Sequence, residues 1–490
     1  MMSFYRRMLP AIVLFVVILA GCQGSLPAPT STIPGQQTPT RVDTGTAQPT
    51  NTAIVPTPTR SATPTPTVPP HLDLDTTGLR GVKIDFWHPW QGDLAARAEE
   101  LVRAFNKENE WGLVVRVRSL YAPTGLAEAL AATPAPDPLR AEERPEMVAA
   151  LPEQLAEWQR QNQLVDLNDY TAAQDWGLSP NQISGFHAIF WDQDLGLGGQ
   201  RAGIPALRTA RVLFYNQTWA SELGYPQAPT TPDEFQTQAC AAAVANAGPR
   251  SEKSGTGGWL ASTDALTTWS WFRAFGAQPA PQDSSGAYHF QSDEAGKAIR
   301  FLHTLFEKGC AWEGLSLTPH DYFANRMALL YAGSLQDLPF QAHAQERANS
   351  GDRWTILPFP SVEGEPLALT TGYSYGILVS TREKQMGAWL FTRYLLQPRN
   401  QALLAEVWPS FPLSDAAQEQ MADYKEHFPW FMILPLQEAL QPAPAQASWR
   451  RVRGVVEDAA WQVFRLPADQ LQYVLPQMDQ LSQEILNARK

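Results

Sequence analysis

The sequence lacks the short motifs that mark metal and nucleotide chemistry. None of the patterns His-Glu-x-x-His, Cys-x-x-Cys or Gly-x-x-x-x-Gly-Lys-Ser/Thr occurs in its 490 residues. Basic residues are in deficit, because 37 Lys and Arg stand against 49 Asp and Glu, for a net charge of -12 at pH 7. This balance disfavours nucleic acid and anionic membrane surfaces as partners. We therefore expect no metal, no cofactor and no nucleic acid.

Apolar runs long enough to cross a bilayer are also lacking. The run from Met8 to Ala20 is shorter than the roughly 20 residues that a spanning helix requires. It follows Arg6 and Arg7, as in a signal peptide, which we place at residues 1–21. Its end, Leu19-Ala20-Gly21-Cys22, resembles the bacterial lipobox, whose cysteine is diacylated before cleavage. The alternative is an ordinary secretory signal with Cys22 near the cleavage site by chance.

Apolar side chains are scarce in the next segment. Residues 23–72 consist mostly of Pro, Thr, Ser, Ala, Gln and Gly, with repeated Thr-Pro steps. Such a composition buries too little surface to offset the entropy of ordering, and proline favours an extended chain. We interpret residues 22–80 as a lipid anchor followed by a disordered linker. A tether of this kind is expected where its start is fixed to a membrane and its end carries a folded body.

Cysteine is rare, with Cys22, Cys240 and Cys310 as the three examples. If Cys22 is lipidated, two cysteines remain in an oxidising compartment, where disulfides persist. Cys240 and Cys310 either form a disulfide or remain two buried thiols. The sequence leaves both open, because it gives no distance between them.

The body that begins near residue 81 shows an alternation of strands and helices. Residues 82–87 and 113–118 alternate as strands do, and residues 94–107 between them carry apolar side chains at helical spacing. Strand, helix and strand form a βαβ unit, which predicts a parallel sheet and an α/β fold. Thr231 and Glu234 are placed as a capping box at the start of a helix. Further strands are expected at 211–215, 354–358 and 376–380, and further helices at 154–161, 385–396 and 449–490.

Motifs in a fixed order along this body resemble those of family 1 bacterial extracellular solute-binding proteins. The segments that carry the resemblance are Phe86-Trp87-His88, Leu101 to Asn106, Gly203 to Pro205, Val212 to Gln217, Leu223 to Tyr225, Pro229 to Phe235, Phe323 to Leu330, Gly333-Ser334, Gly372-Tyr373, Ala388 to Phe391 and Trp408 to Pro412. The sequence departs from the family at Arg144-Pro145-Glu146, where a shorter carboxylate is usual, and in an insertion at residues 133–143.

The resemblance implies a periplasmic-binding-protein type II fold, like that of maltose-binding protein, in which two α/β lobes face each other across a cleft. One lobe is expected from residues 81–213 plus 365–407 and the other from 214–364 plus 408–490. It also implies a monomer that captures a sugar or related solute by hinge closure and delivers it to ABC permease subunits.

The first candidate ligand contacts come from loops and strand ends. Trp90, Gln91 and Asp93 follow the opening strand, at the end where open α/β sheets bind ligands. Trp90 offers a flat face for a sugar ring, and the other two offer hydrogen bonds. Tyr215 ends a strand, and Trp259 follows two glycines and is expected in a loop. For each of these aromatic side chains, simple packing is the alternative.

Further candidates rest on the resemblance alone. Tyr373 and Ser374, expected just before a strand, and Trp408, expected at the end of a helix, correspond to cleft positions of the family. Arg208 and Asp264 are weaker polar candidates.

Three other functions compete with transport. Gly372 to Gly376 matches the Gly-x-Ser-x-Gly nucleophile elbow of a hydrolase, with Ser374 as nucleophile, His427 downstream and Asp415 or Asp423 as the acid. That elbow requires a helix directly after the serine, whereas this segment continues as an expected strand. A glycosidase needs two carboxylates at a set separation, which the sequence cannot pair. A surface receptor that binds a sugar without transport stays open.

Overall fold

The computed structural model describes residues 72–133, 144–196, 198–247, 256–281, 286–421 and 428–488. The predicted signal peptide, Cys22 and most of the predicted linker lie outside these ranges, as do residues 134–143 of the insertion. In the part of the chain that is described, no helix combines the length and apolar composition that a membrane crossing requires.

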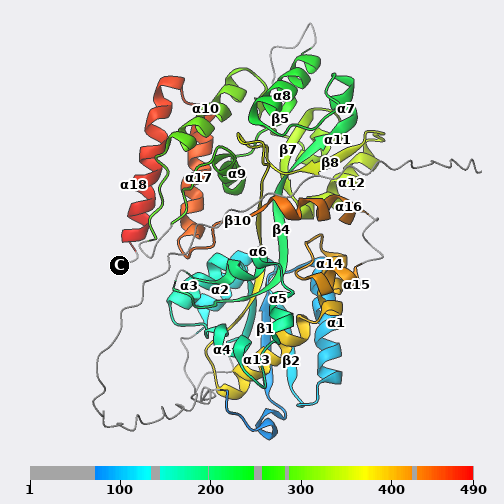
Figure 1. Cartoon of the computed structure of the whole chain (residues 1–490), viewed down its shortest axis with the longest axis vertical. Coiled ribbons are helices and arrows are strands. Elements are labelled where there is room, and N and C mark those ends of the chain that lie inside the picture. Colours follow the sequence, from blue (N-terminus) through cyan, green and yellow to red (C-terminus); the bar gives the residue numbers. More distant parts are fainter. Residues whose placement is uncertain are drawn as a thin grey trace, which may run out of the picture. The chain divides into compact units, whose positions relative to one another are not determined.

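Helices and strands alternate along the chain, as the sequence predicts (Figure 1). The strands are β1 Lys83–His88, β2 Val114–Ser119, β3 Met147–Ala150, β4 Ile204–Asn216, β5 Gly257–Leu260, β6 Ala311–Trp312, β7 Ala328–Ser334, β8 Trp354–Leu357, β9 Ala368–Ile377 and β10 Leu440–Pro442. The α-helices are α1 Gly92–Glu108, α2 Pro123–Ala132, α3 Pro152–Arg160, α4 Leu167–Ala172, α5 Pro180–Ser184, α6 Ala188–Trp191, α7 Gln217–Glu222, α8 Pro232–Asn246, α9 Ala265–Ala274, α10 Asp293–Glu307, α11 Pro319–Ala324, α12 Leu338–Arg347, α13 Arg382–Leu395, α14 Pro398–Val407, α15 Asp415–Gln420, α16 Trp430–Ile433, α17 Trp449–Val463 and α18 Val474–Asn487.

One mixed sheet runs through the described residues in the order β2-β1-β3-β9-β4-β7-β5-β6. Strands β1, β2 and β3 are parallel to one another, and so are β5, β6 and β7. The long strand β4 joins the two sets, because it pairs antiparallel with β9 along its first part and with β7 and β8 along its last part. Figure 1 shows β4 running between the two groups of helices.

Two clusters of buried apolar side chains flank this sheet. The first core is centred on β1, α1 and α13, with Ile84, Leu101 and Trp389, and continues past β4 to Tyr331 of β7. The second core lies around α8, β5, α9, α10 and α17 and includes Trp271 and Val456. Burial of these faces is the main favourable term in folding, and it fixes the two parallel sets on either side of β4. The exact lobe boundaries drawn from the sequence stay a prediction.

Local sequence signals explain where several helices begin. Leu94, Leu101 and Phe105, at the predicted helical spacing, form the buried face of α1. The predicted capping box of α8 is confirmed, because the N–H of Glu234 donates to Oγ1 of Thr231 and the Glu234 carboxylate accepts the N–H of Thr231 in return. The Cys240–Cys310 disulfide is present and ties α8 to the start of β6, with 4.4 Å between the Cα atoms.

Three expectations about secondary structure are wrong. Trp259 lies in β5 and not in a loop. The preceding glycine is there for close approach, because a Cβ atom on Gly258 would overlap the carbonyl oxygen of Cys310. Tyr373 and Ser374 lie inside β9 and not before a strand. The helix expected over 449–490 is two helices, interrupted at Pro467, whose missing N–H cannot continue the first.

Candidate functional site

The carboxyl ends of both parallel strand sets carry polar loops, and ligands of open α/β sheets bind at such ends. On the first set, β1 leads into the loop before α1, and β3 leads directly into α3. On the second set, β5 leads to Asp264 at the start of α9, and β7 leads to Asp337 before α12. We call these the first edge and the second edge.

The second edge holds a cavity of about 360 Å³. Its lining includes the polar side chains of Arg211, His320 and Asp337 and the apolar side chains of Leu260 and Leu317. A concave site with a few convergent polar groups on an apolar wall is the general form of a small-molecule pocket.

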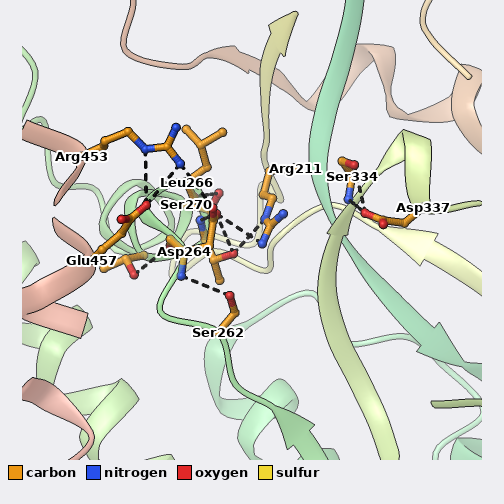
Figure 2. Close-up of polar contacts among 11 residues, drawn as sticks. Arg211, Ser262, Asp264, Leu266, Ser270, Ser334, Asp337, Arg453 and Glu457 are labelled. Atoms are coloured by element: carbon orange, nitrogen blue, oxygen red, sulfur yellow. Dashed lines mark hydrogen bonds and ion pairs between the residues drawn. The ribbon is translucent and has the colours of Figure 1, made fainter. Parts of the chain in front are cut away.

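Arg211 is the central cation of this edge (Figure 2). It projects from β4, where its Nε donates to Oγ1 of Thr267 at 2.8 Å and its Nη2 lies 3.3 Å from Oδ1 of Asp264. The other oxygen of Asp264 lies 4.0 Å from Nη2 of Arg453, which is also paired with Glu457. The network therefore joins β4, α9 and α17 around one carboxylate, which holds the Arg211 side chain in place beside the cavity.

Asp337 supplies a second fixed carboxylate. Its Oδ2 accepts the N–H of Ser334 at 2.7 Å and the Ser334 hydroxyl at 3.0 Å, and its Oδ1 lies 3.2 Å from Nε2 of His320. Burial acts to raise the pKa of Asp337, but the hydrogen bonds from His320 and Ser334 outweigh it and lower the pKa below its ordinary value. The cavity lining thus contains a stable negative charge in addition to the cation of Arg211.

The first edge presents Tyr373 and Glu153. Tyr373 is half-buried on β9, and burial followed by the nearby charge of Glu153 raises its pKa to about 12. Glu153 is buried in the first turn of α3, and burial raises its pKa to about 7, against the opposing fields of Arg453 and Arg450. Arg453, whose charge acts on Glu153, also lies 4.0 Å from Asp264 of the second edge.

Four predicted ligand contacts are enclosed by protein in this structure. Trp90 stacks on His88 with ring centroids 4.8 Å apart, packs edge-on against Tyr373 and is 3% exposed. Tyr215 donates to Oε1 of Gln238 in the second core. Trp259 is 0% exposed.

Ser374, the fourth enclosed residue, corrects the hydrolase hypothesis. It lies in the middle of β9, between Ala150 and Pro205 of the neighbouring strands, where a nucleophile elbow would need a sharp turn and a helix. Its buried hydroxyl contacts the carboxylate of Asp194 at 2.7 Å and accepts a hydrogen bond from Nη2 of Arg208 at 3.0 Å.

The remaining hydrolase candidates do not assemble around that serine. Asp415 is largely exposed on α15, and Asp423 and His427 lie outside the described residues. Arg208, a weaker ligand candidate, is fully buried and binds Asp194 and the carbonyl of Tyr373, so it joins strands to the segment after α6.

The other sequence candidates keep some exposed surface. Gln91 is exposed, and its amide donates to the carbonyl of Tyr121. Asp93 is exposed in the first turn of α1. Trp408 caps α14 and is half-buried against the first core. Contact of Gln91, Asp93, Tyr373 or Trp408 with a ligand stays a prediction.

Arg211, Glu153 and Asp337 were not among the site residues predicted from the sequence. Arg211 lay inside an expected strand with no sign of which face it would occupy. Glu153 directly follows the end of β3, which was the one available signal, since strand ends carry ligand sites. Across the described residues, His, Cys, Asp and Glu form no group of three that could hold a metal ion.

Comparison with known proteins places this geometry in context. A family model described as bacterial extracellular solute-binding protein matches residues 100–429. No curated protein matches the sequence.

Solved structures share the fold. The sugar-binding protein MalE from the phytopathogen Xanthomonas citri is 20% identical with a TM-score of 0.69, over 83% of this chain and 98% of that one. The cyclic alpha-maltosyl-1,6-maltose binding protein from Arthrobacter globiformis is 14% identical with a TM-score of 0.68, over 83% and 99%. UgpB from Mycobacterium tuberculosis, in complex with glycerophosphocholine, is 17% identical with a TM-score of 0.62, over 83% and 99%. These similarities confirm the predicted type II binding-protein fold.

Proposed function

Because the chain belongs to the family of bacterial extracellular solute-binding proteins, we propose that it captures a carbohydrate or related polyol for an ABC importer. The family places the chain outside the cytoplasm. The observation that carries the ligand class is the cavity at the second edge, which Arg211 and Asp337 line together with the apolar side chains of Leu260 and Leu317. Sugars require this combination, since their hydroxyls bind polar groups and their ring faces bind apolar surface.

The similar structures support the same ligand class. Two of them are sugar-binding proteins, for maltose-related ligands in one case, and one holds glycerophosphocholine, which carries a glycerol backbone. We therefore extend the proposal from sugars to polyols.

The proposed mechanism is hinge closure about β4 and β9. A ligand at the second edge that also reaches Tyr373 or Glu153 contacts both edges only when they are close together. Such a ligand favours the closed arrangement, because it binds that state more tightly than an open one. Gln91, Asp93 and Trp408 are proposed as further contacts of the closed state.

We further propose that Cys22 is lipidated and that residues 22–80 tether the body to the membrane. The lipobox-like sequence before Cys22 supports this assignment. Metabolic labelling with a radioactive fatty acid should mark the wild-type chain and not a Cys22→Ser variant, which should be released from the membrane fraction. Equal labelling of both would refute it.

Ligand binding is tested on the chain carrying Cys22→Ser, which is expected to be soluble. A thermal-shift panel of maltose, maltotriose, trehalose and glycerophosphocholine should contain at least one compound that raises Tm, because a ligand at about 100 times its Kd stabilises the folded state by about 2.7 kcal/mol. A panel with no effect on Tm would contradict the proposed ligand class.

Two variants then locate the site. Arg211→Gln should weaken binding of the active compound by about tenfold or more, since it removes a charged hydrogen-bond donor. Arg300→Gln, at an exposed position of α10, is the matched control and should bind as the wild type does. Equal affinity of both variants for the compound would show that the ligand does not bind at the second edge.

An uptake assay distinguishes a transport function from a receptor that binds the solute without transport. Cells without this protein should lose uptake of the identified compound, and a copy with wild-type Arg211 should restore it. Uptake that continues unchanged would favour the receptor alternative.

A further inference from the structure

The phenol oxygen of Tyr322 is surrounded by hydrogen-bond donors from one short loop. It accepts the backbone N–H groups of Leu315, Ser316 and Leu317 at 3.2, 3.0 and 3.2 Å, and the Ser316 hydroxyl lies 3.1 Å away. Residues 313–318 connect β6 to α11, and we call them the β6–α11 loop. Three successive backbone groups thus converge on a single side-chain atom.

The ring of Tyr322 is also fixed by its neighbours. The side chain is 4% exposed, and it packs edge-on against Trp312 with centroids 4.8 Å apart. Gly314 lies so close that a Cβ atom there would overlap the Tyr322 ring. The Tyr322 side chain is therefore held in one position, and the backbone of the loop wraps around its oxygen.

The leucine side chains of the β6–α11 loop are exposed to solvent. Leu315 is 97% exposed and Leu317 is 49% exposed. The N–H groups of residues 315–317 all donate to the Tyr322 oxygen. Without that oxygen, three donors would turn to water and the loop would lose its common anchor.

The same loop forms part of the wall of the proposed ligand site. Gly314, Leu317 and Tyr322 line the cavity of about 360 Å³ together with Arg211 and Asp337. Leu317 and Leu260 both contribute apolar surface to this lining. The position of Leu317 therefore determines how wide the cavity is and how much apolar surface a solute meets.

We propose that Tyr322 is a positioning residue for solute binding, whose phenol oxygen holds the β6–α11 loop so that Leu317 forms the apolar wall of the cavity. The role of the wall in binding rests on the proposed function. The anchoring of the loop does not, so the two can fail separately.

The hydrogen bonds have a spectroscopic consequence. Those from Ser316, Leu317 and Leu315 lower the pKa of Tyr322 to about 8, because they stabilise the phenolate. Tyr331, which lines the same cavity, has its pKa raised well above the ordinary value by burial, so its ionisation does not overlap.

The first experiment tests the anchor without any ligand. In the Cys22→Ser chain, the tyrosinate absorbance should show a step near pH 8 that Tyr322→Phe removes. Hydrogen–deuterium exchange of a peptide covering 313–319 should speed up in Tyr322→Phe and stay slow in Ser316→Ala, which keeps the three backbone donors. Tyr170→Phe, a buried tyrosine with its hydroxyl on Gln385, is the matched control and should change neither readout. Slow exchange of the loop in Tyr322→Phe would overturn the anchor.

The second experiment tests the wall. Tyr322→Phe should weaken binding of the compound that raises Tm by about tenfold, and Tyr170→Phe should not. Leu317→Ala should weaken binding to a similar extent while the step near pH 8 persists. This variant removes the apolar side chain from the cavity lining and keeps the Tyr322 oxygen with its hydrogen bonds. Wild-type affinity in both Tyr322→Phe and Leu317→Ala would overturn the positioning role. If no compound raises the Tm of the wild type, the proposed function fails, and the exchange data still decide the anchor.

Discussion

Nζ of Lys384 on α13 lies 2.7 Å from Oε1 of Glu146, a residue 238 positions earlier in the chain. The other carboxylate oxygen accepts the N–H of Asp85 on β1 at 2.8 Å. Glu146 is 1% exposed and immediately precedes β3, so one buried carboxylate ties together two strands and a helix. The departure from the family at this position therefore keeps an acidic group that is fully used within the fold.

Glu146→Ala should destabilise the chain by about 3 kcal/mol, because it removes one partner of a buried ion pair and leaves the N–H of Asp85 without its acceptor. Urea unfolding measures the change. Glu99→Ala is the control, since Glu99 pairs with Arg103 at an exposed position and should change stability by about 0.5 kcal/mol or less. Equal effects would show that Glu146 is not a structural carboxylate.

Glu153 should make stability fall as the pH rises. Its pKa is about 7 in the folded chain, against 4.5 as the ordinary value, so between these limits the folded state binds more protons than the unfolded state. The free energy of unfolding should therefore drop between pH 4.5 and 7, by on the order of 3 kcal/mol, and stay low above that range. Glu153→Gln should remove this drop, as followed by urea unfolding at several pH values, and Glu128→Gln on the exposed face of α2 should retain it.

Gly258 and Gly454 should respond in opposite directions to alanine. A Cβ atom at Gly258 would overlap the backbone of the neighbouring strand, so Gly258→Ala should lower the free energy of unfolding by about 3 kcal/mol or prevent folding. Gly454 lies inside α17 with open space at its Cβ position, so Gly454→Ala should stabilise by about 1 kcal/mol. Thermal unfolding of the two variants compares them directly, and similar shifts would contradict the close strand approach.

Loss of the Cys240–Cys310 disulfide should destabilise the chain by about 4 kcal/mol, given the separation of 70 positions between the cysteines. The double variant Cys240→Ala with Cys310→Ala measures this loss. A thiol assay on the denatured, unreduced Cys22→Ser chain should find no free thiol. Detection of two thiols would show that the disulfide does not form in the protein as produced.

Much of the architecture was predictable because it depends on local patterns. The βαβ start, the buried face of α1 and the capping box at Thr231 follow from side-chain spacing within a few residues. Trp259 shows where such signals mislead. Two adjacent glycines usually mark a loop, but here Gly258 admits the backbone of a strand that is distant in sequence.

The candidate site was harder to predict, since it depends on contacts between distant segments. Trp90 is predicted to bind through its flat face, but it stacks on His88 and is 3% exposed. Arg211 gave no local signal, because only the path of β4 places it beside Asp264 and the cavity. Side-chain chemistry can thus be read from the sequence, whereas the solvent access that decides its use depends on tertiary packing.

Strand β9 has a consequence for the order in which the protein can mature. It is inserted between β3 and β4, yet the ribosome makes it long after both of them. Until residue 377 has emerged, β3 and the first part of β4 lack their shared partner, and the first set of strands remains open. A chain whose sheet is completed by a late segment stays unfinished during synthesis, and non-local pairing of this kind is slow. That delay suits a secreted protein, because translocation through a narrow channel requires a chain that has not yet folded.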